Sequence, residues 1–343
     1  MRLATWNIEW FNSLFDDEGA PLDDGEWSSR HDVTRHDQLA AVGHVMTALD
    51  ADALMIIEAP DHSGRRSTVR ALERFAQLAG LRARRALVGF TNDTQQEIAL
   101  LYDPDEVEAV HDPRGDPTGK TGSPDAPRFD GVFRIDLDID AVEDLVRFSK
   151  PPLEARLTTR EGAVLRLIGV HLKSKAPYGA STPADVMRIA ITNRRKQLAQ
   201  AVWLRGRIEA HLALDEPLIV LGDFNDGPGL DEYEGLFGRS SIEVVLGEGK
   251  ALRLYDPHAR SVLGARIGAM HSTSRFYMNH EGRYMQALLD YIMISPDLLA
   301  RGPVWRIWHP FDDPACYSDD ALRRALLAAS DHFPVTLDID LEA

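Results

Sequence analysis

Short apolar runs recur along the chain and are separated by polar stretches, a pattern typical of proteins that combine strands with helices. Runs of this length, bounded by turn-forming residues, suit buried strands better than long helices. The strands that they predict cover residues 2–9, 53–58, 84–90, 97–102, 132–138, 153–158, 164–171, 217–222, 288–294 and 334–339.

Apolar residues at helical spacing predict two long helices, over about residues 36–50 and 183–213. The second begins with Pro183 directly after a serine and a threonine, an arrangement that favours a helix start. Shorter helices are expected near residues 66–79, 296–301 and 319–329.

Two segments lack a regular pattern. Residues 111–131 have the composition of a loop, and residues 258–287 are expected to form a long irregular excursion. We find no internal repeat and no linker long enough to divide the chain. A single domain over residues 1–343 is therefore expected.

Composition changes this picture little. The chain has 343 residues, of which 44% are hydrophobic and 27% charged, as in ordinary soluble proteins.

No run approaches the ~20 apolar residues that cross a bilayer, so membrane insertion is not expected. The first residues carry no pattern of a signal peptide. The single cysteine, Cys316, excludes an internal disulfide framework and a cysteine-rich zinc site. We expect a cytoplasmic protein.

The net charge of −16, from 54 acidic and 38 basic residues, argues against a protein that coats nucleic acid through bulk electrostatics. It does not exclude a polyanionic substrate. Basic residues cluster at 82–85 ("RARR") and 193–196 ("NRRK"). Solvated surface is the default interpretation of both clusters, and a stripe that follows a phosphate backbone is the alternative.

Polar side chains close several of the predicted strands. In "LIVLGDFND", Asp223 and Asn225 follow a buried run, and residues at i and i+2 of an extended chain point to the same side. Other strands end in the same manner, with Asn7, Glu58, His171, Asp290 or the group Ser330, Asp331 and His332 at or near a terminus. An array of such ends predicts a shared cavity lined with acids, amides and imidazoles.

Crowded carboxylates remain ionised together only when a cation lies among them. Oxygen donors from Asp, Glu and Asn, without cysteine, suit Mg²⁺ or Mn²⁺ better than zinc. A hard ion beside two imidazoles suits the cleavage of phosphate esters, because the metal polarises a phosphoryl oxygen while positioned side chains move protons.

In chain order, "WNIEW", "MIIE", "EIALLYD", "VHLKSK", "GDFND", "LDYI" and "SDH" resemble the motifs of the endonuclease/exonuclease/phosphatase superfamily. That superfamily includes pancreatic deoxyribonuclease, abasic-site endonucleases, neutral sphingomyelinases and inositol polyphosphate 5-phosphatases. The resemblance runs from residue 2 to about residue 336. It implies an α/β fold, a four-layered sandwich of two packed mixed β-sheets flanked by helices, with the site at one end.

The resemblance also implies roles for individual residues. Asn7 and Glu58 belong to the metal site, with Glu9 and Asp331 as additional ligands of Mg²⁺ or Mn²⁺. Asp223 and Asn225 approach the attacking water and the phosphoryl oxygen, and His171 and His332 flank the scissile phosphate. Glu97 is expected to orient His171, and Asp290 to orient His332. Contacts to substrate phosphate are expected from Lys173, Ser174, Lys150 and Arg194.

The chain departs from the superfamily pattern at three positions. Ile57 and Val170 replace a frequent Gln and a frequent Asn, and Lys150 stands where Arg is frequent, so that a point charge replaces a bidentate fork. Asp331 and His332 are neighbours and can share one site only if the backbone turns there, for which Pro334 is favourable.

We therefore expect a divalent-metal-dependent phosphodiester hydrolase that works by in-line attack of water, most simply a nuclease that cleaves DNA or RNA. A phosphatase or phosphodiesterase for a small phosphorylated substrate is the alternative, and an inactive binding module on the same scaffold is a remote one. Either Asp223 or His332 accepts the proton of water. No obligate protein partner is predicted.

Overall fold

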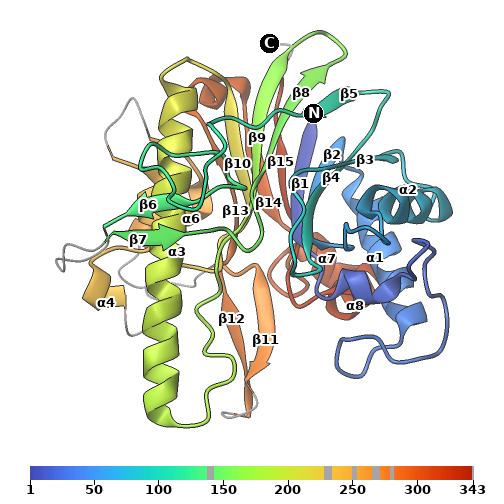
Figure 1. The fold of residues 1–343 in the computed structure, drawn as a ribbon. Coiled ribbons are helices and arrows are strands. Elements are labelled where there is room, and N and C mark those ends of the chain that lie inside the picture. Colours follow the sequence, from blue (N-terminus) through green and yellow to red (C-terminus); the bar gives the residue numbers. More distant parts are fainter. Residues whose placement is uncertain (137–142, 228–233, 249–252, 265–270, 279–281, 342–343) are drawn as a thin grey trace.

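Two mixed β-sheets packed face to face form the centre of the computed structural model, and helices cover their outer faces (Figure 1). The structure describes residues 1–136, 143–227, 234–248, 253–264, 271–278 and 282–341. This arrangement confirms the expected four-layered α/β sandwich.

The larger sheet has six strands. Their order is β14 (Val304–Ile307), β15 (Val335–Asp338), β1 (Arg2–Asn7), β2 (Ala53–Ala59), β4 (Glu97–Tyr102) and β3 (Arg85–Val88). The outer face of this sheet packs against helical elements, namely η1 (Phe11–Leu14), α1 (Arg35–Leu49), α2 (Thr68–Leu78), α7 (Pro314–Ser318) and α8 (Asp320–Ala329).

The second sheet has five strands. Their order is β13 (Asp290–Ile294), β10 (Leu218–Asp223), β9 (Val164–His171), β8 (Leu153–Thr159) and β5 (Val107–His111). Two short hairpins pair β6 (Phe133–Ile135) with β7 (Asp144–Val146) and β11 (Ser274–Met278) with β12 (Arg283–Ala287). The remaining helices are α3 (Pro183–Leu212), α4 (Glu234–Phe237), α5 (Ser241–Leu246), α6 (Pro257–Gly264) and the 3-10 helix η2 (Pro296–Arg301).

Local capping explains where the two long helices begin. The Thr34 side chain accepts a hydrogen bond from the backbone N–H of Asp37 at the start of α1. At the start of α3, the Thr182 side chain accepts from the N–H of Asp185, and proline occupies the first turn. Each cap satisfies a backbone donor that the first turn of a helix leaves without an intrahelical partner.

Strand alternation divides the core into three layers. Leu3, Met55 and Leu221 point between the sheets, whereas their neighbours Ala4 and Ile56 point toward the helices of the larger sheet. Because successive strand residues face opposite sides, each strand contributes to two layers. This alternation decides which polar residues at the strand ends face the other sheet.

The strand directions bring the predicted site residues to one end of the sandwich. In parallel pairs, Asn7 of β1 lies opposite Ile57 of β2, and Asp223 of β10 lies opposite His171 of β9. Strand β13 runs antiparallel to β10 and begins at Asp290, opposite Asp223. Both chain termini lie at the other end of the sheets (Figure 1).

The predicted elements compare well with the structure in the centre of the fold. The strands predicted at 2–9, 53–58, 97–102 and 164–171 correspond to β1, β2, β4 and β9, and both long helices are present. Residues 137 and 138 of the strand predicted at 132–138 lie outside the described residues, and β6 is shorter than expected.

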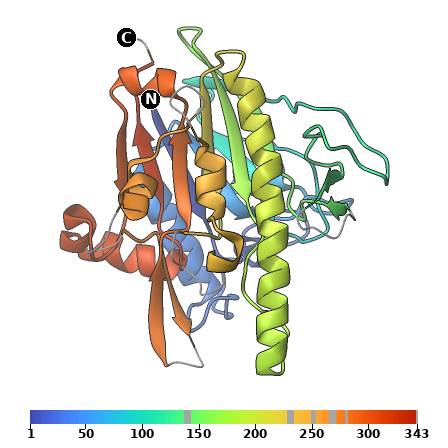
Figure 2. The same cartoon turned by 90° about the vertical axis from the view of Figure 1, so that its left-hand side faces the viewer.

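The expectation of an irregular excursion over residues 258–287 is wrong for the described part of that segment, and residues 265–270 and 279–281 lie outside the described residues. Much of it is regular, with α6 followed by the β11–β12 hairpin, which projects past the sheets together with the first half of α3 (Figures 1 and 2). The hairpin was missed because Ser, Arg, Tyr and Met alternate there without a buried apolar face. Within the described part of the chain, no helix has both the length and the apolar character needed to cross a membrane.

Gly222 offers a test of the strand end that carries Asp223. Its φ is 138°, and an added Cβ would lie 2.1 Å from the carbonyl oxygen of Val170 on the neighbouring strand. We expect Gly222→Ala to lower the free energy of unfolding by roughly 1–3 kcal/mol, measured by urea denaturation, because the backbone must shift. Gly119→Ala, whose Cβ would enter open space, is the control. Equal stability of the two variants would contradict this account.

Candidate active site

A cavity of about 430 Å³ opens at the end of the sandwich where the polar strand ends meet. It brings together residues that are far apart in the sequence. Of the predicted site residues, those lining it are Asn7, Glu9, Glu58, Lys150, His171, Lys173, Ser174, Asp223, Asn225, Asp331 and His332.

Asp223 lies at the centre of a hydrogen-bonded group that joins the two sheets. Its Oδ2 accepts from Asn7 Nδ2 at 3.0 Å and from Asn225 Nδ2 at 3.1 Å, and its Oδ1 accepts from the backbone N–H of Asn225 at 2.7 Å. Asn225 has a φ of 50°, a left-handed conformation that asparagine tolerates. Burial raises the pKa of Asp223 to about 7.

A β-bulge directs Glu58 into the cavity. Ile56 faces the helices, so simple alternation would place Glu58 on the same outer face. The register between β2 and β4 shifts between Ile57 and Ala59, and Glu58 adopts a φ of 63°. Its Oε2 accepts from Gln96 Nε2 at 2.8 Å and from the N–H of Trp10 at 3.3 Å. The extra residue of the bulge thus re-aims this carboxylate.

Three carboxylates, from Glu9, Glu58 and Asp331, line the cavity and lie close enough to influence one another electrostatically. Burial, with a further contribution from Asp331 and then Glu58, raises the pKa of Glu9 to about 7, although Arg30 forms an ion pair with it. Burial also raises the pKa of Glu58. Carboxylates in this arrangement are stabilised in their charged form by a cation.

One buried atom supports a metal at this place. Asn7 is 3% exposed, and its Oδ1 has no hydrogen-bond partner among the described residues, while its Nδ2 is held by Asp223. An amide oxygen next to a group of carboxylates is a typical donor set for a hard divalent cation. Asn7, Glu9, Glu58 and Asp331 therefore fit such an ion.

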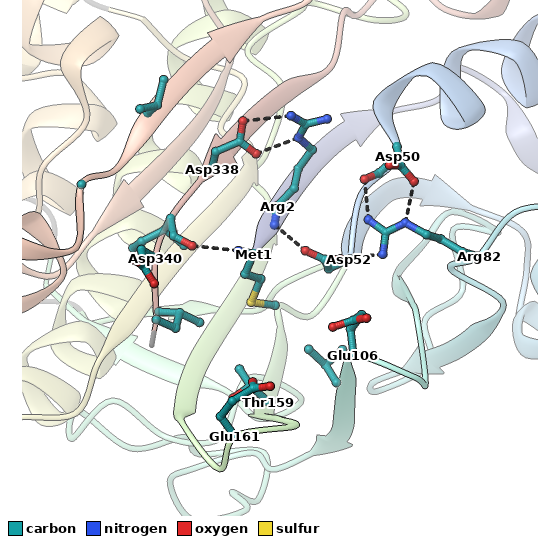
Figure 3. Close-up of a pocket in the computed structure, with 15 residues that line it drawn as sticks. Met1, Arg2, Asp50, Asp52, Arg82, Glu106, Thr159, Glu161, Asp338 and Asp340 are labelled. Atoms are coloured by element: carbon teal, nitrogen blue, oxygen red, sulfur yellow. Dashed lines mark hydrogen bonds and ion pairs between the residues drawn. The ribbon is translucent and has the colours of Figure 1, made fainter. Parts of the chain in front are cut away.

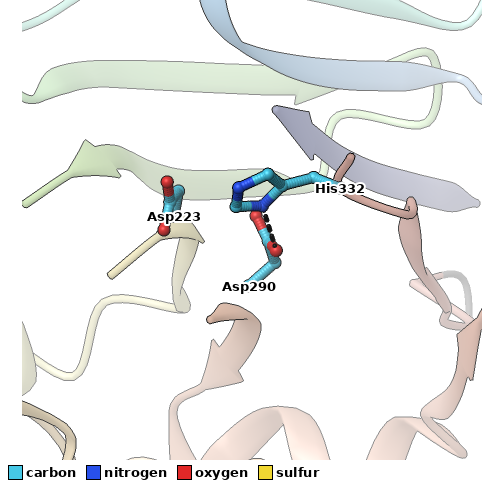
Figure 4. A group of neighbouring side chains, drawn as sticks. All are labelled: Asp223, Asp290 and His332. Atoms are coloured by element: carbon cyan, nitrogen blue, oxygen red, sulfur yellow. Dashed lines mark hydrogen bonds and ion pairs between the residues drawn. The ribbon is translucent and has the colours of Figure 1, made fainter. Parts of the chain in front are cut away.

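His332 is held by a buried carboxylate (Figure 4). Its Nδ1 lies 2.8 Å from Asp290 Oδ2, which also accepts a hydrogen bond from the Thr273 hydroxyl at 2.7 Å. Burial acts to lower the pKa of His332, but the Asp290 carboxylate outweighs it and raises that pKa well above its usual value. The structure thus places Asp290 against His332, the two residues expected to pair.

Asp223, Asp290 and His332 form a compact group, with one ligand atom of each within 4.8 Å of the others. By composition this group could hold a metal ion. The Nδ1 of His332 is, however, already hydrogen-bonded to Asp290. The group therefore fits proton transfer as well as it fits metal binding.

His171 lies between a carboxylate and a lysine. Its Nε2 is 3.5 Å from Asp223 Oδ2 and 3.5 Å from Lys150 Nζ. Burial, helped by the Lys150 charge, lowers the pKa of His171 well below its usual value, and burial likewise lowers the pKa of Lys150. The two imidazoles of the cavity thus have opposite electrostatic environments.

The expectation that Glu97 orients His171 is wrong. The Glu97 carboxylate accepts from Asn92 Nδ2 at 2.7 Å and lies 3.4 Å from the N–H of His62, whereas Nδ1 of His171 has no hydrogen-bond partner within the described ranges. The cause is the alternation of side chains along β4. Glu97 lies on the same face as Ala99, which packs toward the helices, so the Glu97 side chain points away from the other sheet.

The expected contact between Arg194 and substrate phosphate is also wrong. Arg194 is 1% exposed, and its guanidinium lies 3.4 Å from Asp226, beneath the loop that follows β10. Asp226 is itself fully buried and also pairs with Lys175. Arg194 therefore stabilises the loop that carries Asn225 and does not line the cavity.

Several residues that line the cavity or support it from behind were not found from the sequence. Gln96 donates to Glu58, and the strand parity that turns Glu97 outward brings this neighbour inward. Thr273 supports Asp290 from a segment expected to be irregular. Trp10 and Tyr178 line the cavity with side chains that are largely open to solvent, at 48% and 81% exposure.

A larger cavity, of about 610 Å³, lies at the opposite end of the sandwich, around the chain termini (Figure 3). Arg2 and Arg82 pair there with carboxylates, including Asp338 at 2.7 Å and Asp52 at 2.5 Å. Asp50, Asp52 and Asp338 are thus paired with arginines, and no histidine is among the residues that line this cavity. The chemistry is concentrated in the smaller cavity at the strand ends.

Comparison with known proteins agrees with this geometry. The model of the family described as Endonuclease/Exonuclease/phosphatase family matches residues 4–332. A comparison with curated protein sequences finds no match.

Solved structures of similar fold cover nearly the whole chain. An AP endonuclease from Archaeoglobus fulgidus has a TM-score of 0.51 at 12% identity, over 99% of this chain and 100% of that chain. Truncated TDP2 from Caenorhabditis elegans has a TM-score of 0.49 at 14% identity, over 98% and 96%. The 3' phosphatase NExo from Neisseria, bound to product DNA hairpin, has a TM-score of 0.48 at 17% identity, over 99% of each chain. At such identities, likeness concerns the fold alone, and the first of these structures supports it.

Proposed function

The chain belongs to the endonuclease/exonuclease/phosphatase family, whose members are hydrolytic phosphoesterases, and from this membership we propose that it is a divalent-metal-dependent phosphodiester hydrolase of nuclease type. One observation carries the proposal. His332, held by Asp290, and His171 both lie next to Asp223 in a single cavity that the carboxylates of Glu9, Glu58 and Asp331 also line.

Asn7, Glu9, Glu58 and Asp331 would hold the ion, and their oxygen donors favour Mg²⁺ or Mn²⁺. When bound, such an ion neutralises the carboxylates and polarises a phosphoryl oxygen. The bulge at Glu58 and the hydrogen bond from Gln96 keep the Glu58 carboxylate directed into the cavity.

We assign the base role to Asp223. Donors on Asn7 and Asn225 fix the position of its carboxylate, and one of its oxygens faces His171. His332 is kept protonated by Asp290 and so acts as a donor to the phosphoryl group, not as the acceptor of a proton from water. His171 and Lys150 add further donors beside the scissile phosphate.

The nuclease assignment is supported by the family and by the lysines of the cavity, Lys150 and Lys173. A small phosphorylated substrate is the second candidate, and the net charge of −16 favours it because a long polyanion is repelled by most of the surface. The two candidates share the same chemistry at phosphorus.

Substitution at the centre of the cavity tests the proposed hydrolysis. We expect Asp223→Asn and His332→Ala each to lower kcat for bis-p-nitrophenyl phosphate by about 10²–10⁴-fold, since each removes a proton-transfer or donor group. Release of p-nitrophenolate is the measurement, and circular dichroism checks that both variants fold. Full activity in either folded variant would contradict the assignment.

A matched pair of carboxylates tests how His332 is positioned. Asp290→Asn should lower kcat by on the order of 10² and move the alkaline limb of the pH–rate profile to lower pH, because Asp290 raises the pKa of His332. Glu97→Gln should change kcat less than tenfold and leave the profile in place, because Glu97 contacts Asn92 and His62. Similar pH–rate profiles for the two variants would refute the assignment of His332 positioning to Asp290 and not to Glu97.

Metal binding can be measured without turnover. Mg²⁺ or Mn²⁺ at a hundredfold excess over Kd should stabilise the wild type by about 2.7 kcal/mol, because the ion binds the folded state. Thermal unfolding in EDTA and in either metal should show this difference. Glu58→Gln should abolish the increase, whereas the exposed control Glu18→Gln should retain it. An undiminished increase in Glu58→Gln would place the ion elsewhere.

A further inference from the structure

A second cavity of about 430 Å³ adjoins the candidate active site on the side of α3. The two cavities share Ser149 and Lys173, so they are continuous along the segment that follows β7. The walls come from β7 and the following residues on one side, and from α3 on the other. Apart from the shared Lys173, the chemistry proposed above uses no side chain of this second cavity.

Cations dominate its lining. Arg147, Lys173, Arg195 and Lys196 line it, against a single carboxylate, Asp144, which lies 3.6 Å from Arg195. Lys173 and Lys196 are close enough that, after burial, the Lys196 charge further lowers the pKa of Lys173. Positive charges held together in this way favour binding of an anion.

Such an excess of positive charge contrasts with the rest of this acidic chain. In the "RARR" cluster, Arg82 pairs with Asp50, Asp52 and Asp103, and Arg84 pairs with Asp103 and Asp105. The "NRRK" cluster differs, because helical geometry turns Arg194 inward to Asp226 and leaves Arg195 and Lys196 on the cavity. Within the described part of the chain, Arg147 and Lys196 form no ion pair with a carboxylate.

We propose that this second cavity binds a further phosphate group of the substrate whose scissile phosphate lies in the catalytic cavity, and that the substrate is therefore an oligonucleotide. The inference rests on the proposed function and narrows it. Two adjoining anion sites have no purpose for a substrate with one phosphate, whereas successive phosphodiesters occupy both.

Exposed aromatic side chains favour an oligonucleotide over a small polyphosphate. Trp10 and Tyr178 line the catalytic cavity and remain 48% and 81% exposed. Nucleobases stack on such rings, at about 1–3 kcal/mol per base, and an inositol polyphosphate offers no such face.

The test compares substrates that differ by one phosphate: the dinucleotide TpT, with a single phosphodiester, and its phosphorylated forms pTpT and TpTp. In the wild type, at least one phosphorylated form should show a kcat/KM about tenfold above that of TpT. The variant Arg147→Gln/Lys196→Gln should remove this advantage, mainly through KM. Arg70→Gln/Arg324→Gln, which removes the same charge from exposed positions on α2 and α8, should retain it.

Binding gives a readout that does not depend on hydrolysis. The anisotropy of fluorescein-labelled d(T)₈ in EDTA gives the association constant K at several salt concentrations. The slope of log K against the logarithm of the salt concentration should be smaller, by about 1, in Arg147→Gln/Lys196→Gln than in the wild type or the control. If the wild type hydrolyses none of the substrates, the proposed function fails, and this slope alone decides the inference.

Three results would overturn the inference. The first is an equal loss of kcat/KM for TpT, pTpT and TpTp in Arg147→Gln/Lys196→Gln, and the second is a salt slope the same as in the control. The third is a higher kcat/KM for inositol 1,4-bisphosphate than for inositol 1-phosphate, without any difference between TpT and its phosphorylated forms. That result would assign the cavity to a small polyphosphate.

Discussion

The burial of several carboxylates in one cavity is the constraint on which the rest of the site depends. Asp223 comes from one sheet and Glu58 from the other, and their pKa values are raised by burial. Such groups are costly to keep charged without compensation. The chain supplies part of it through Asn7, which donates to Asp223 across the sheet interface at 3.0 Å, and through His332, whose pKa Asp290 raises well above its usual value. The cation proposed above would supply the remainder, and it would link the stability of this end of the sandwich to its chemistry.

The backbone adopts uncommon conformations at the positions that the chemistry needs. Glu58 and Asn225 both have positive φ, and the bulge at Glu58 interrupts an otherwise regular pairing of β2 with β4. A regular strand would direct the Glu58 carboxylate toward the helices, on the face where Ile56 packs. Such local strain persists because the flanking strands are buried on both faces and fix the chain on either side. The sheets therefore act as the rigid support that holds the carboxylate in place.

The sequence predicted the strands of the two central sheets and the residues at their ends, because buried runs and their polar termini are both local signals. Two assignments failed for reasons that alternation or helical geometry explains: Glu97 faces the helices, and Arg194 faces Asp226. The sequence "QEIALL" shows that alternate residues face opposite sides of the sheet. Which of the two sets faces the other sheet depends on packing, and the sequence of one strand does not reveal it. The β11–β12 hairpin was missed because it has no continuous apolar face, yet Thr273, directly before β11, supports Asp290.

A chain with a net charge of −16 can accept a polyanion only where the local potential differs from the average. At physiological ionic strength, charges more than about 8 Å apart are largely screened, so the acids around the chain termini have little influence on the opposite end of the sandwich. The arginines around the chain termini form ion pairs with neighbouring acids, as Arg82 does with Asp52. The cations beside the catalytic cavity, such as Arg147 and Lys196, have no acid partner of this kind among the described residues. In the proposed function, selectivity for phosphate would thus follow from which cations are left without an acid, not from how many the chain contains.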